Sequence, residues 1–249
     1  MKTISKYFEI DPLVYLFAFL SIITASFSTF IIISFLIIVH ELGHFIFAKI
    51  LAMEVDKIII YPFGGISKFK MPLNTPIYKE LMILLMGPLF QFLAYFIILQ
   101  LFPDNKDIIN LYHYSILIFN LLPIYPLDGG KLLNLFFSLK FPLKRSLYME
   151  IFISYLMVLI IILINKENIN INLIIITIFL LYKITKEYKQ VELLYNKFLL
   201  ERYLYKYNFS KSVIIQNINN FHKNKRHLLK LNDKYYLENE ILQKIYKNR

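Results

Sequence analysis

Apolar residues run along this chain in long stretches that no charged residue interrupts. The first stretch extends from Pro12 to Val39, which is 28 residues. About 20 such residues suffice to cross the hydrocarbon core of a bilayer. The chain is therefore predicted to be a polytopic membrane protein. Its first stretch is expected to be a retained span, because acidic residues precede it and no small-residue cleavage site is present.

The hydrophobic runs predict six membrane-spanning helices. They cover about residues 13–26, 29–53, 80–102, 108–122, 148–164 and 169–182. Pro123 and Pro126 break the fourth span, which is expected to resume after Gly130. The predicted fold class is an all-α polytopic membrane protein with a short C-terminal region.

One segment departs from the helical pattern. Residues 57–71 read KIIIYPFGGISKFKM, in which two β-prone runs flank Gly64 and Gly65. This arrangement is typical of a β-hairpin. We expect a small re-entrant hairpin that follows the second span on the cytoplasmic side.

Basic residues predict the orientation of the chain. With both termini in the cytoplasm, the inside segments before residue 183 hold 11 Lys and Arg, whereas the outside loops hold only Lys106 and Lys166. Cytoplasmic loops carry such an excess in membrane proteins. Residues 1–189 are expected to form the transmembrane domain. Residues 190–249 are expected to form a cytoplasmic region that begins as a helix continuing from the last span.

Composition changes this picture in three ways. The chain is 57% hydrophobic, against about 45–50% in soluble domains. Its net charge of +11 fits loops that face anionic lipid, and nucleic acid is not expected as a partner. Cysteine is absent, so a disulfide is excluded and any zinc site must use His, Asp or Glu.

The sequence HELGH at residues 40–44 carries the clearest chemical signal. Residues four apart share one face of a helix, so His40 and His44 can hold one zinc ion. Glu41 lies beside the first ligand, where it can take a proton from a water molecule. This is the H-E-x-x-H signature of metalloproteases. The alternative is a chance match with histidines at the membrane interface.

A zinc site with two histidines needs a third protein ligand and a position for water. Asp128 is the strongest candidate, because it follows two prolines at the cytoplasmic end of the fourth span. Its alternative role is to cap a helix that starts near Lys131. His113 is the rival third ligand, although an interfacial histidine bonded to a neighbour is the simpler interpretation. His222 and His227 are expected on a solvated surface of the tail.

These motifs together resemble the site-2 protease family of intramembrane zinc metalloproteases, peptidase family M50. The family carries HExxH on one span and NxxPxxxLDG on a later one. Here the second motif runs from Asn120 through Pro123 and Asp128 to Gly129. The Phe63-Gly64-Gly65 hairpin and Gly87-Pro88-Leu89 match further features of the family.

The resemblance implies a zinc protease in which His40, His44 and Asp128 hold Zn²⁺ and Glu41 acts as the general base. Asn120 would stabilise the oxyanion, or alternatively would only pack against another helix. The hairpin residues Phe63, Gly64 and Gly65 would bind an extended substrate by adding a strand to the sheet.

The phrases LPIYPLDGGK at 122–131 and KFLLERY at 197–203 resemble the sporulation branch of this family. That branch implies the pro-sequence of a mother-cell sigma factor as substrate, inhibitory membrane proteins as partners, and a place in the bacterial cell membrane or the outer forespore membrane. Members carry a C-terminal nucleotide-sensing CBS region. Only about fifty residues follow Tyr203, which leaves room for a truncated CBS-like element, so ATP binding is not carried over to this chain.

Other functions remain open from the sequence alone. The same protease chemistry could act on an anti-sigma factor or on signal-peptide remnants. A non-catalytic zinc-binding or zinc-transporting membrane protein would also keep the metal ligands. It would need no base beside them, however, and Glu41 argues against it.

Overall fold

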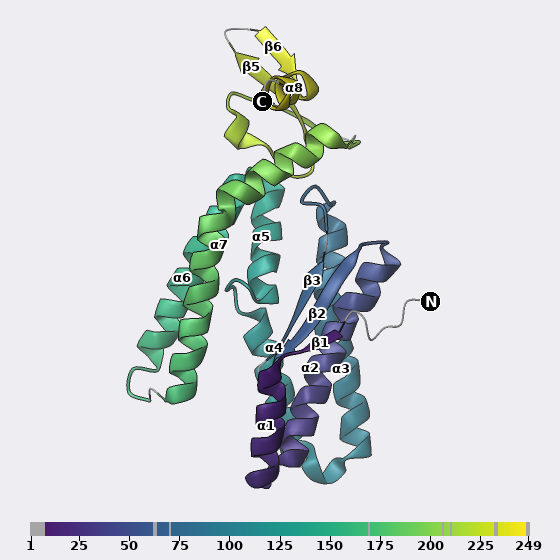
Figure 1. Cartoon of the computed structure of the whole chain (residues 1–249), viewed down its shortest axis with the longest axis vertical. Coiled ribbons are helices and arrows are strands. Elements are labelled where there is room, and N and C mark those ends of the chain that lie inside the picture. The colour runs from purple at the N-terminus through teal and green to yellow at the C-terminus, as the bar shows by residue number, and fades with distance from the viewer. Residues whose placement is uncertain are drawn as a thin grey trace. The chain divides into compact units, whose positions relative to one another are not determined.

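A computed structural model describes residues 8–61, 64–69, 71–168, 170–205, 207–209, 211–231 and 234–247 (Figure 1). Its helices and strands are β1 (Phe8–Ile10), α1 (Pro12–Ile23), α2 (Phe27–Ile50), β2 (Val55–Tyr61), β3 (Gly64–Phe69), α3 (Ile77–Leu101), α4 (Lys106–Leu121), α5 (Asp128–Lys140), α6 (Leu143–Ile164), α7 (Ile171–Leu204), β4 (Ser212–Ile215), β5 (Arg226–Leu231), β6 (Lys234–Leu237) and α8 (Glu238–Tyr246). Short 3₁₀ turns occupy Pro103–Asn105 and Ile218–Asn220. The chain divides into two compact units, residues 1–71 with 81–120, and residues 72–80 with 121–249.

Six helices overlap the six expected spans. Among the described residues, three of these helices are long and apolar enough to cross a membrane, namely α2, α3 and α6. Helix α1 has 12 residues and α4 has 16, which correspond to about 18 and 24 Å of helix. The structure thus supports a helical membrane protein, and the count of six spans stays a prediction.

The first unit packs its helices beside a small sheet. The β-hairpin expected around Gly64 and Gly65 is present, since β2 and β3 pair antiparallel with Tyr61 opposite Gly64. Strand β1 adds to β2 in parallel, with Phe8 opposite Ile58, so the sheet has three strands where two were predicted. A cluster of apolar side chains joins α2, α3 and α4: Ile32, Leu36, Tyr95, Ile98 and Ile109.

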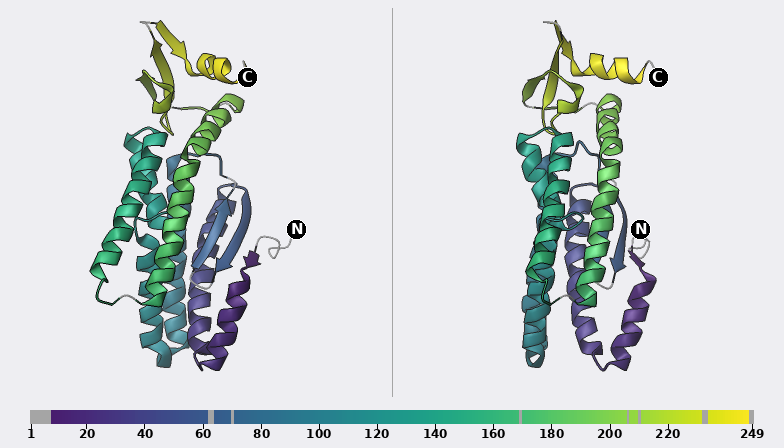
Figure 2. Two further views of the ribbon diagram at one scale, coloured as in Figure 1. Left: turned by 60° about the vertical axis from the view of Figure 1, so that its left-hand side comes forward. Right: turned by 90° about the vertical axis from the view of Figure 1, so that its left-hand side faces the viewer.

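In the second unit, α6 packs against both α5 and α7 (Figure 2). A core formed by α6, α7 and the loop before α5 contains Ile124, Ile151, Val158, Leu180, Ile184 and Val191. Helix α7 has 34 residues and passes through residue 190 without a break. This confirms the expectation that the C-terminal region begins as a continuation of the last helix.

The C-terminal region beyond α7 folds into a second sheet, which the all-α prediction did not include. Strands β4, β5 and β6 lie in that order, with β4 parallel and β6 antiparallel to β5. Helix α8 packs against this sheet, and the core contains Tyr195, Phe198, Phe221, Leu229 and Leu242. The strands are only four to six residues long, too short to show a clear alternating pattern.

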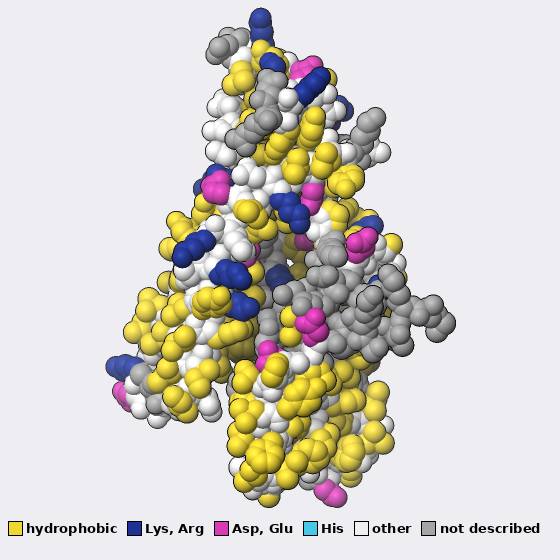
Figure 3. Space-filling view, in the orientation of Figure 1, with side chains coloured by type: hydrophobic (Ala, Val, Ile, Leu, Met, Phe, Trp, Pro, Cys, Tyr) yellow, Lys and Arg dark blue, Asp and Glu magenta, His cyan; other side chains and the backbone are white. Residues whose placement is uncertain are grey.

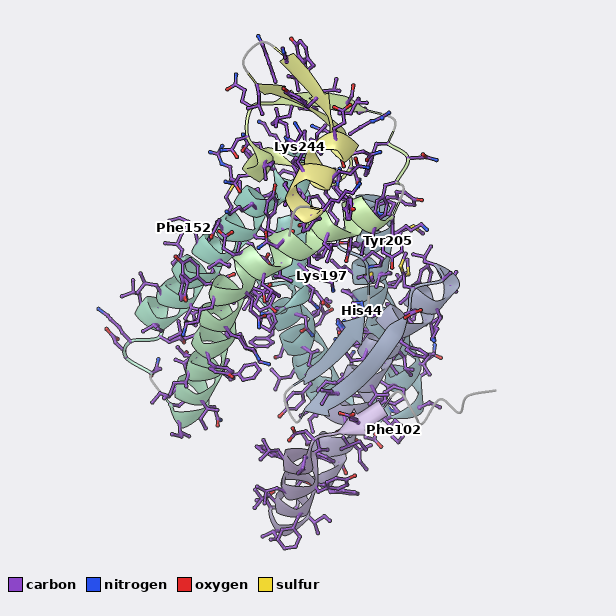
Figure 4. All side chains as sticks on the ribbon, turned by 45° about the horizontal axis from the view of Figure 1, so that its top comes forward. His44, Phe102, Phe152, Lys197, Tyr205 and Lys244 are labelled. Carbon is purple, nitrogen blue, oxygen red and sulfur yellow. The ribbon has the colours of Figure 1, made fainter. Side chains whose placement is uncertain are left out.

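The surface of several helices is strongly apolar. Hydrophobic side chains cover the end of the first unit that carries α1 (Figure 3). Seven large apolar residues of α1 are exposed: Leu13, Tyr15, Leu16, Phe19, Leu20, Ile22 and Ile23. On α6, Phe152 projects from the helix and is 69% exposed (Figure 4). Such surfaces are stable in lipid rather than in water.

Candidate metal centre

The HELGH residues lie in the buried half of α2. The exposed fractions of His40, Glu41 and His44 are 2%, 6% and 3%. The two imidazoles face one another along the helix, with their Nε2 atoms 3.1 Å apart. Figure 4 marks His44. The helical spacing predicted from the sequence therefore brings the two imidazole rings together.

Helix α3 supplies a hydrogen-bond partner to each ring. The Nδ1 atom of His44 lies 2.8 Å from the backbone oxygen of Ile83. The Nδ1 atom of His40 lies 3.0 Å from the Oε1 atom of Gln91. Both partners are acceptors, so both Nδ1 atoms carry the proton. Each Nε2 atom then has only a lone pair to offer.

This arrangement fits a zinc ion. Two Nε2 lone pairs 3.1 Å apart repel one another unless a cation lies between them. Two nitrogen ligands of a tetrahedral zinc ion, each at about 2.0–2.1 Å, are separated by about 3.3 Å. Metal-bound histidines commonly donate their other N–H to a carbonyl or carboxylate group, and both rings do so here. The His pair thus has the donor atoms, the tautomer and the spacing that zinc requires.

Gly87 lets α3 approach His44 closely. It lies midway between Ile83 and Gln91, four residues from each, so the three share one face of α3. A Cβ atom at this position would overlap the His44 ring at Nε2 and Cε1. The Gly87-Pro88-Leu89 segment, which the sequence offered as a feature of the family, thus contains a position where only glycine leaves room for the ring.

Asp128 lies in the second unit, as the first residue of α5. Leu127, not Asp128, is the N-cap residue, so the alternative role of helix cap is wrong. Asp128 is 5% exposed, and its Oδ1 atom accepts a hydrogen bond from Lys131 at 3.1 Å. The chain turns tightly before it, because a Cβ atom at Gly129 would overlap the carbonyl of Leu121. This explains a glycine directly after the aspartate.

Of the remaining predicted site residues, Asn120 is half-buried near the end of α4. Gly64 and Gly65 begin β3, where Gly65 is opposite Ile60. Phe63 lies outside the described residues.

His113 is fully buried within the protein. Its ring stacks on Tyr95 with centroids 4.1 Å apart, and its backbone oxygen accepts a hydrogen bond from Gln91 at 3.0 Å. Its Nε2 atom has no hydrogen-bond partner among the described residues. The expectation that it bonds to a neighbour is confirmed, and its place at the membrane interface stays a prediction.

The expectation of a solvated surface for His227 is wrong. It is 0% exposed: its Nε2 accepts from the His222 backbone at 2.8 Å, and its Nδ1 donates to Glu238 at 3.0 Å. Arg202 beside it donates to Asn74, Glu238 and the carbonyls of residues 222, 223 and 225. In the sequence, this buried cluster is indicated by an arginine and a histidine that lie among aromatic residues.

Burial sets the protonation states in this cluster. It lowers the pKa of His227, while the hydrogen bond to Glu238 acts in the opposite direction. Burial, together with the charges of Lys225, His227 and Arg202, lowers the pKa of His222 to about 4. Burial alone would raise the pKa of Glu238, but the His227 hydrogen bond and the Arg202 charge hold it below its ordinary value.

A cavity of about 610 Å³ lies in the same region. Its lining includes Tyr203, Tyr205, Tyr207, Phe209 and Arg226. Arg202 also lines it, but the hydrogen bonds described above already engage its Nε, Nη1 and Nη2 atoms. The buried guanidinium therefore serves the fold of the region.

Comparison with known proteins agrees with this metal centre. Residues 28–103 match Peptidase family M50. Stage IV sporulation protein FB of Bacillus subtilis is 29% identical over 203 residues, which are 78% of this chain and 70% of that protein. A zinc metalloprotease of Methanocaldococcus jannaschii is 32% identical over 175 residues, 66% of this chain and 50% of its own length. The solved structure of a site-2 protease from Methanocaldococcus jannaschii superposes with a TM-score of 0.59 at 26% identity, covering 75% of this chain and 93% of that one.

A helical membrane fold with a buried histidine pair, whose rings both carry the proton on Nδ1, and an adjacent glutamate defines a membrane zinc metalloprotease. The match of residues 28–103 to Peptidase family M50 and the similarities to Stage IV sporulation protein FB and to a solved site-2 protease confirm the resemblance inferred from the motifs.

Proposed function

We propose that this chain cuts a peptide bond of a membrane-associated protein near the cytoplasmic face of the bilayer, with zinc held by His40, His44 and Asp128 and with Glu41 as the general base. The observation that carries the proposal is the His40–His44 pair. Its Nε2 lone pairs face one another at 3.1 Å beside a buried glutamate.

Asp128 is the third ligand in this proposal. A catalytic zinc site has three protein ligands and an open position, and a carboxylate with two histidines is an established set. All three residues are buried, each within its own unit. Lys131 lies 3.1 Å from one carboxylate oxygen, and the ionised carboxylate is the form that binds metal.

Zinc bound there would lower the pKa of a water molecule to about 7 and polarise the substrate carbonyl. Glu41 takes a proton from the water as its oxygen adds to the carbonyl carbon. Glu41 then returns this proton to the amine as the C–N bond breaks. The Asn120 amide is proposed to donate a hydrogen bond to the oxygen that gains negative charge.

The substrate must be extended at the cut, because a helix keeps its carbonyls in hydrogen bonds. The β1–β2–β3 sheet supports this part of the proposal, since β3 is an edge strand to which an extended segment could add. We assign this role to Phe63, Gly64 and Gly65.

We further propose the pro-sequence of a sporulation sigma factor as the substrate. This is supported by the similarity to Stage IV sporulation protein FB, which extends over 78% of this chain. The protein would then lie in the bacterial cell membrane or the outer forespore membrane, with both termini in the cytoplasm and with membrane proteins that hold it inactive.

The test is co-expression of this chain with a tagged pro-sigma factor from the same organism. Wild type is expected to shorten the substrate, and Glu41→Gln is expected to abolish cleavage while zinc stays bound. Asp128→Asn is expected to lose both cleavage and zinc. Glu167→Gln, the same change at an exposed loop residue, is the matched control and should cleave normally.

The outcomes separate the parts of the proposal. Cleavage that survives Glu41→Gln would overturn the role of the base. Full zinc occupancy in Asp128→Asn would remove Asp128 from the ligand set. If wild type cleaves an anti-sigma factor or signal-peptide remnants but leaves the pro-sigma factor intact, the substrate assignment fails and the protease assignment stands.

A further inference from the structure

Two hydrogen bonds connect His40 to α4 through the side chain of Gln91. The Oε1 atom of Gln91 lies 3.0 Å from His40 Nδ1, and its Nε2 atom donates to the backbone oxygen of His113 at 3.0 Å. Gln91 is 0% exposed and lies within an otherwise apolar part of α3. Burying an amide costs free energy unless its hydrogen bonds are made, and both ends of this one are bonded.

The backbone oxygen of His113 fixes the direction of these hydrogen bonds, because it can only accept. The amide nitrogen of Gln91 must therefore face His113, and its amide oxygen must face His40. An oxygen facing Nδ1 requires the proton on Nδ1. His40 is therefore left with its lone pair on Nε2, the atom that faces His44.

We propose that Gln91 is a positioning residue for the metal centre: it selects the Nδ1–H tautomer of His40 and holds the ring so that Nε2 binds the metal. This inference rests on the proposed zinc site. Partners of this kind orient a ligand and raise its basicity, and their loss costs about 10–100-fold in metal affinity.

His44 offers no equivalent test, because its Nδ1 partner is the backbone oxygen of Ile83, which no substitution removes. Gln91 is the side chain through which the tautomer can be changed. Gln91→Met keeps the length of the side chain and removes the amide. Gln91→Glu keeps an acceptor oxygen at the same reach.

The experiment measures zinc affinity by competition with a chelator on full-length protein purified in detergent. Gln91→Met is expected to bind zinc about 10–100-fold more weakly than wild type. Gln91→Glu is expected to stay within a few-fold of wild type. The matched control is Gln100→Met, the same change at an exposed position on α3, and it should bind zinc as wild type does.

A spectroscopic measurement on unmutated protein tests the same proposal without relying on a variant that folds. Wild type loaded with Co²⁺ is expected to show, for His40, an exchangeable, paramagnetically shifted imidazole N–H proton with a nuclear Overhauser effect to the Cβ protons of the same residue, because an Nδ1–H lies beside them. A His40 N–H proton without this effect, or wild-type zinc affinity in Gln91→Met, would overturn the role of Gln91. Equal losses in Gln91→Met and Gln91→Glu would also do so. The Glu41→Gln result tests the protease itself and is independent of these measurements.

Discussion

The two histidines of the candidate metal centre depend on one face of α3, where Ile83, Gly87 and Gln91 recur every four residues. The first and last supply acceptors to the rings, and the middle one supplies space. The Ile83 carbonyl and the Gln91 amide thus each hold one ring by a hydrogen bond, and Gly87 leaves room for the His44 ring.

Replacing Gly87 by alanine places a methyl group on the His44 ring. The ring must move, and a displacement of about 1 Å at a reacting centre costs about 100-fold in rate. Gly87→Ala is therefore expected to lose at least about 100-fold in cleavage activity together with part of its zinc, measured by substrate processing and metal content. Ser115→Ala, on an exposed face of α4, should retain both. Full activity in Gly87→Ala would show that the ring does not occupy this place in the working enzyme.

The sequence alone indicates the histidines and the aspartate as candidate site residues, because the spacing of the histidines and the prolines and glycines around the aspartate form a pattern along the chain. Gln91, which is 51 residues from His40, was missed. A lone amide in an apolar span was the available signal, since polar residues there face protein or water rather than lipid. Which histidine it meets depends on how two helices pack, and no local pattern contains that information.

At the scale of elements, α6 holds both α5 and the loop that leads to Asp128. The Nδ2 atom of Asn134 on α5 donates to Glu150 on α6 at 2.7 Å, and the Tyr125 backbone donates to the Ser154 hydroxyl at 2.9 Å. Glu150 is 4% exposed. These bonds position α5, whose first residue is Asp128.

Removing the donor from this pair should destabilise the helix packing. Asn134→Leu leaves the buried Glu150 oxygen without its amide donor, which costs about 1–3 kcal/mol. Glu150→Gln keeps an acceptor and should cost less than half as much. Thermal unfolding in detergent measures the difference, with Glu167→Gln at an exposed site as the reference. A stability of Asn134→Leu equal to wild type would exclude a structural role for the pair.

The positions of the helices could be predicted from the sequence. A long apolar segment in lipid must satisfy its own backbone hydrogen bonds, and a helix does so. The hairpin was also predicted, because its two strands are neighbours in sequence and a Gly-Gly pair separates them. Strand β1 was missed, since it pairs with β2 about fifty residues away. The C-terminal sheet was missed for a related reason, because a four-residue strand carries too little pattern of its own.

For the molecule as a whole, Arg202 organises the C-terminal region. Its side chain is 1% exposed and forms an ion pair with Glu238 at 2.9 Å. It also lies over the rings of Phe198 and Phe209, at 4.7 and 4.4 Å from their centroids. A charge buried this deeply is stable only while its partners remain.

Acid should therefore loosen the C-terminal region. The pKa of His222 is lowered from 6.5 to about 4, so the unfolded state binds more protons than the folded state between these pH values. Stability then falls as the pH decreases from about 6.5 towards 4. The lowered pKa of Glu238 acts in the same direction, with its contribution lost below its ordinary value of 4.5.

Hydrogen exchange of residues 212–246 at pH 7.5, 6.5 and 5.5 measures this effect, and protection is expected to decrease at the lower values. His222→Asn removes one titrating ring but keeps the backbone oxygen that Arg202 uses, so it should weaken the pH dependence, of which the lowered pKa of His227 keeps a part. Protection that is constant or increases on acidification would contradict the assignment.

The segment from Pro72 to Glu80 belongs to the second unit, although it includes the first turn of α3 and the rest of that helix belongs to the first unit. Asn74 bonds to Phe198, Glu201 and Arg202, and Glu80 pairs with Lys223. During synthesis, the start of α3 must therefore wait for more than 140 further residues before its partners exist. At about 5–20 residues per second, this delay is about 7–30 seconds. The helix that orients both histidines is thus completed only near the end of translation, so a nascent or prematurely terminated chain would carry the HELGH motif without a finished metal centre.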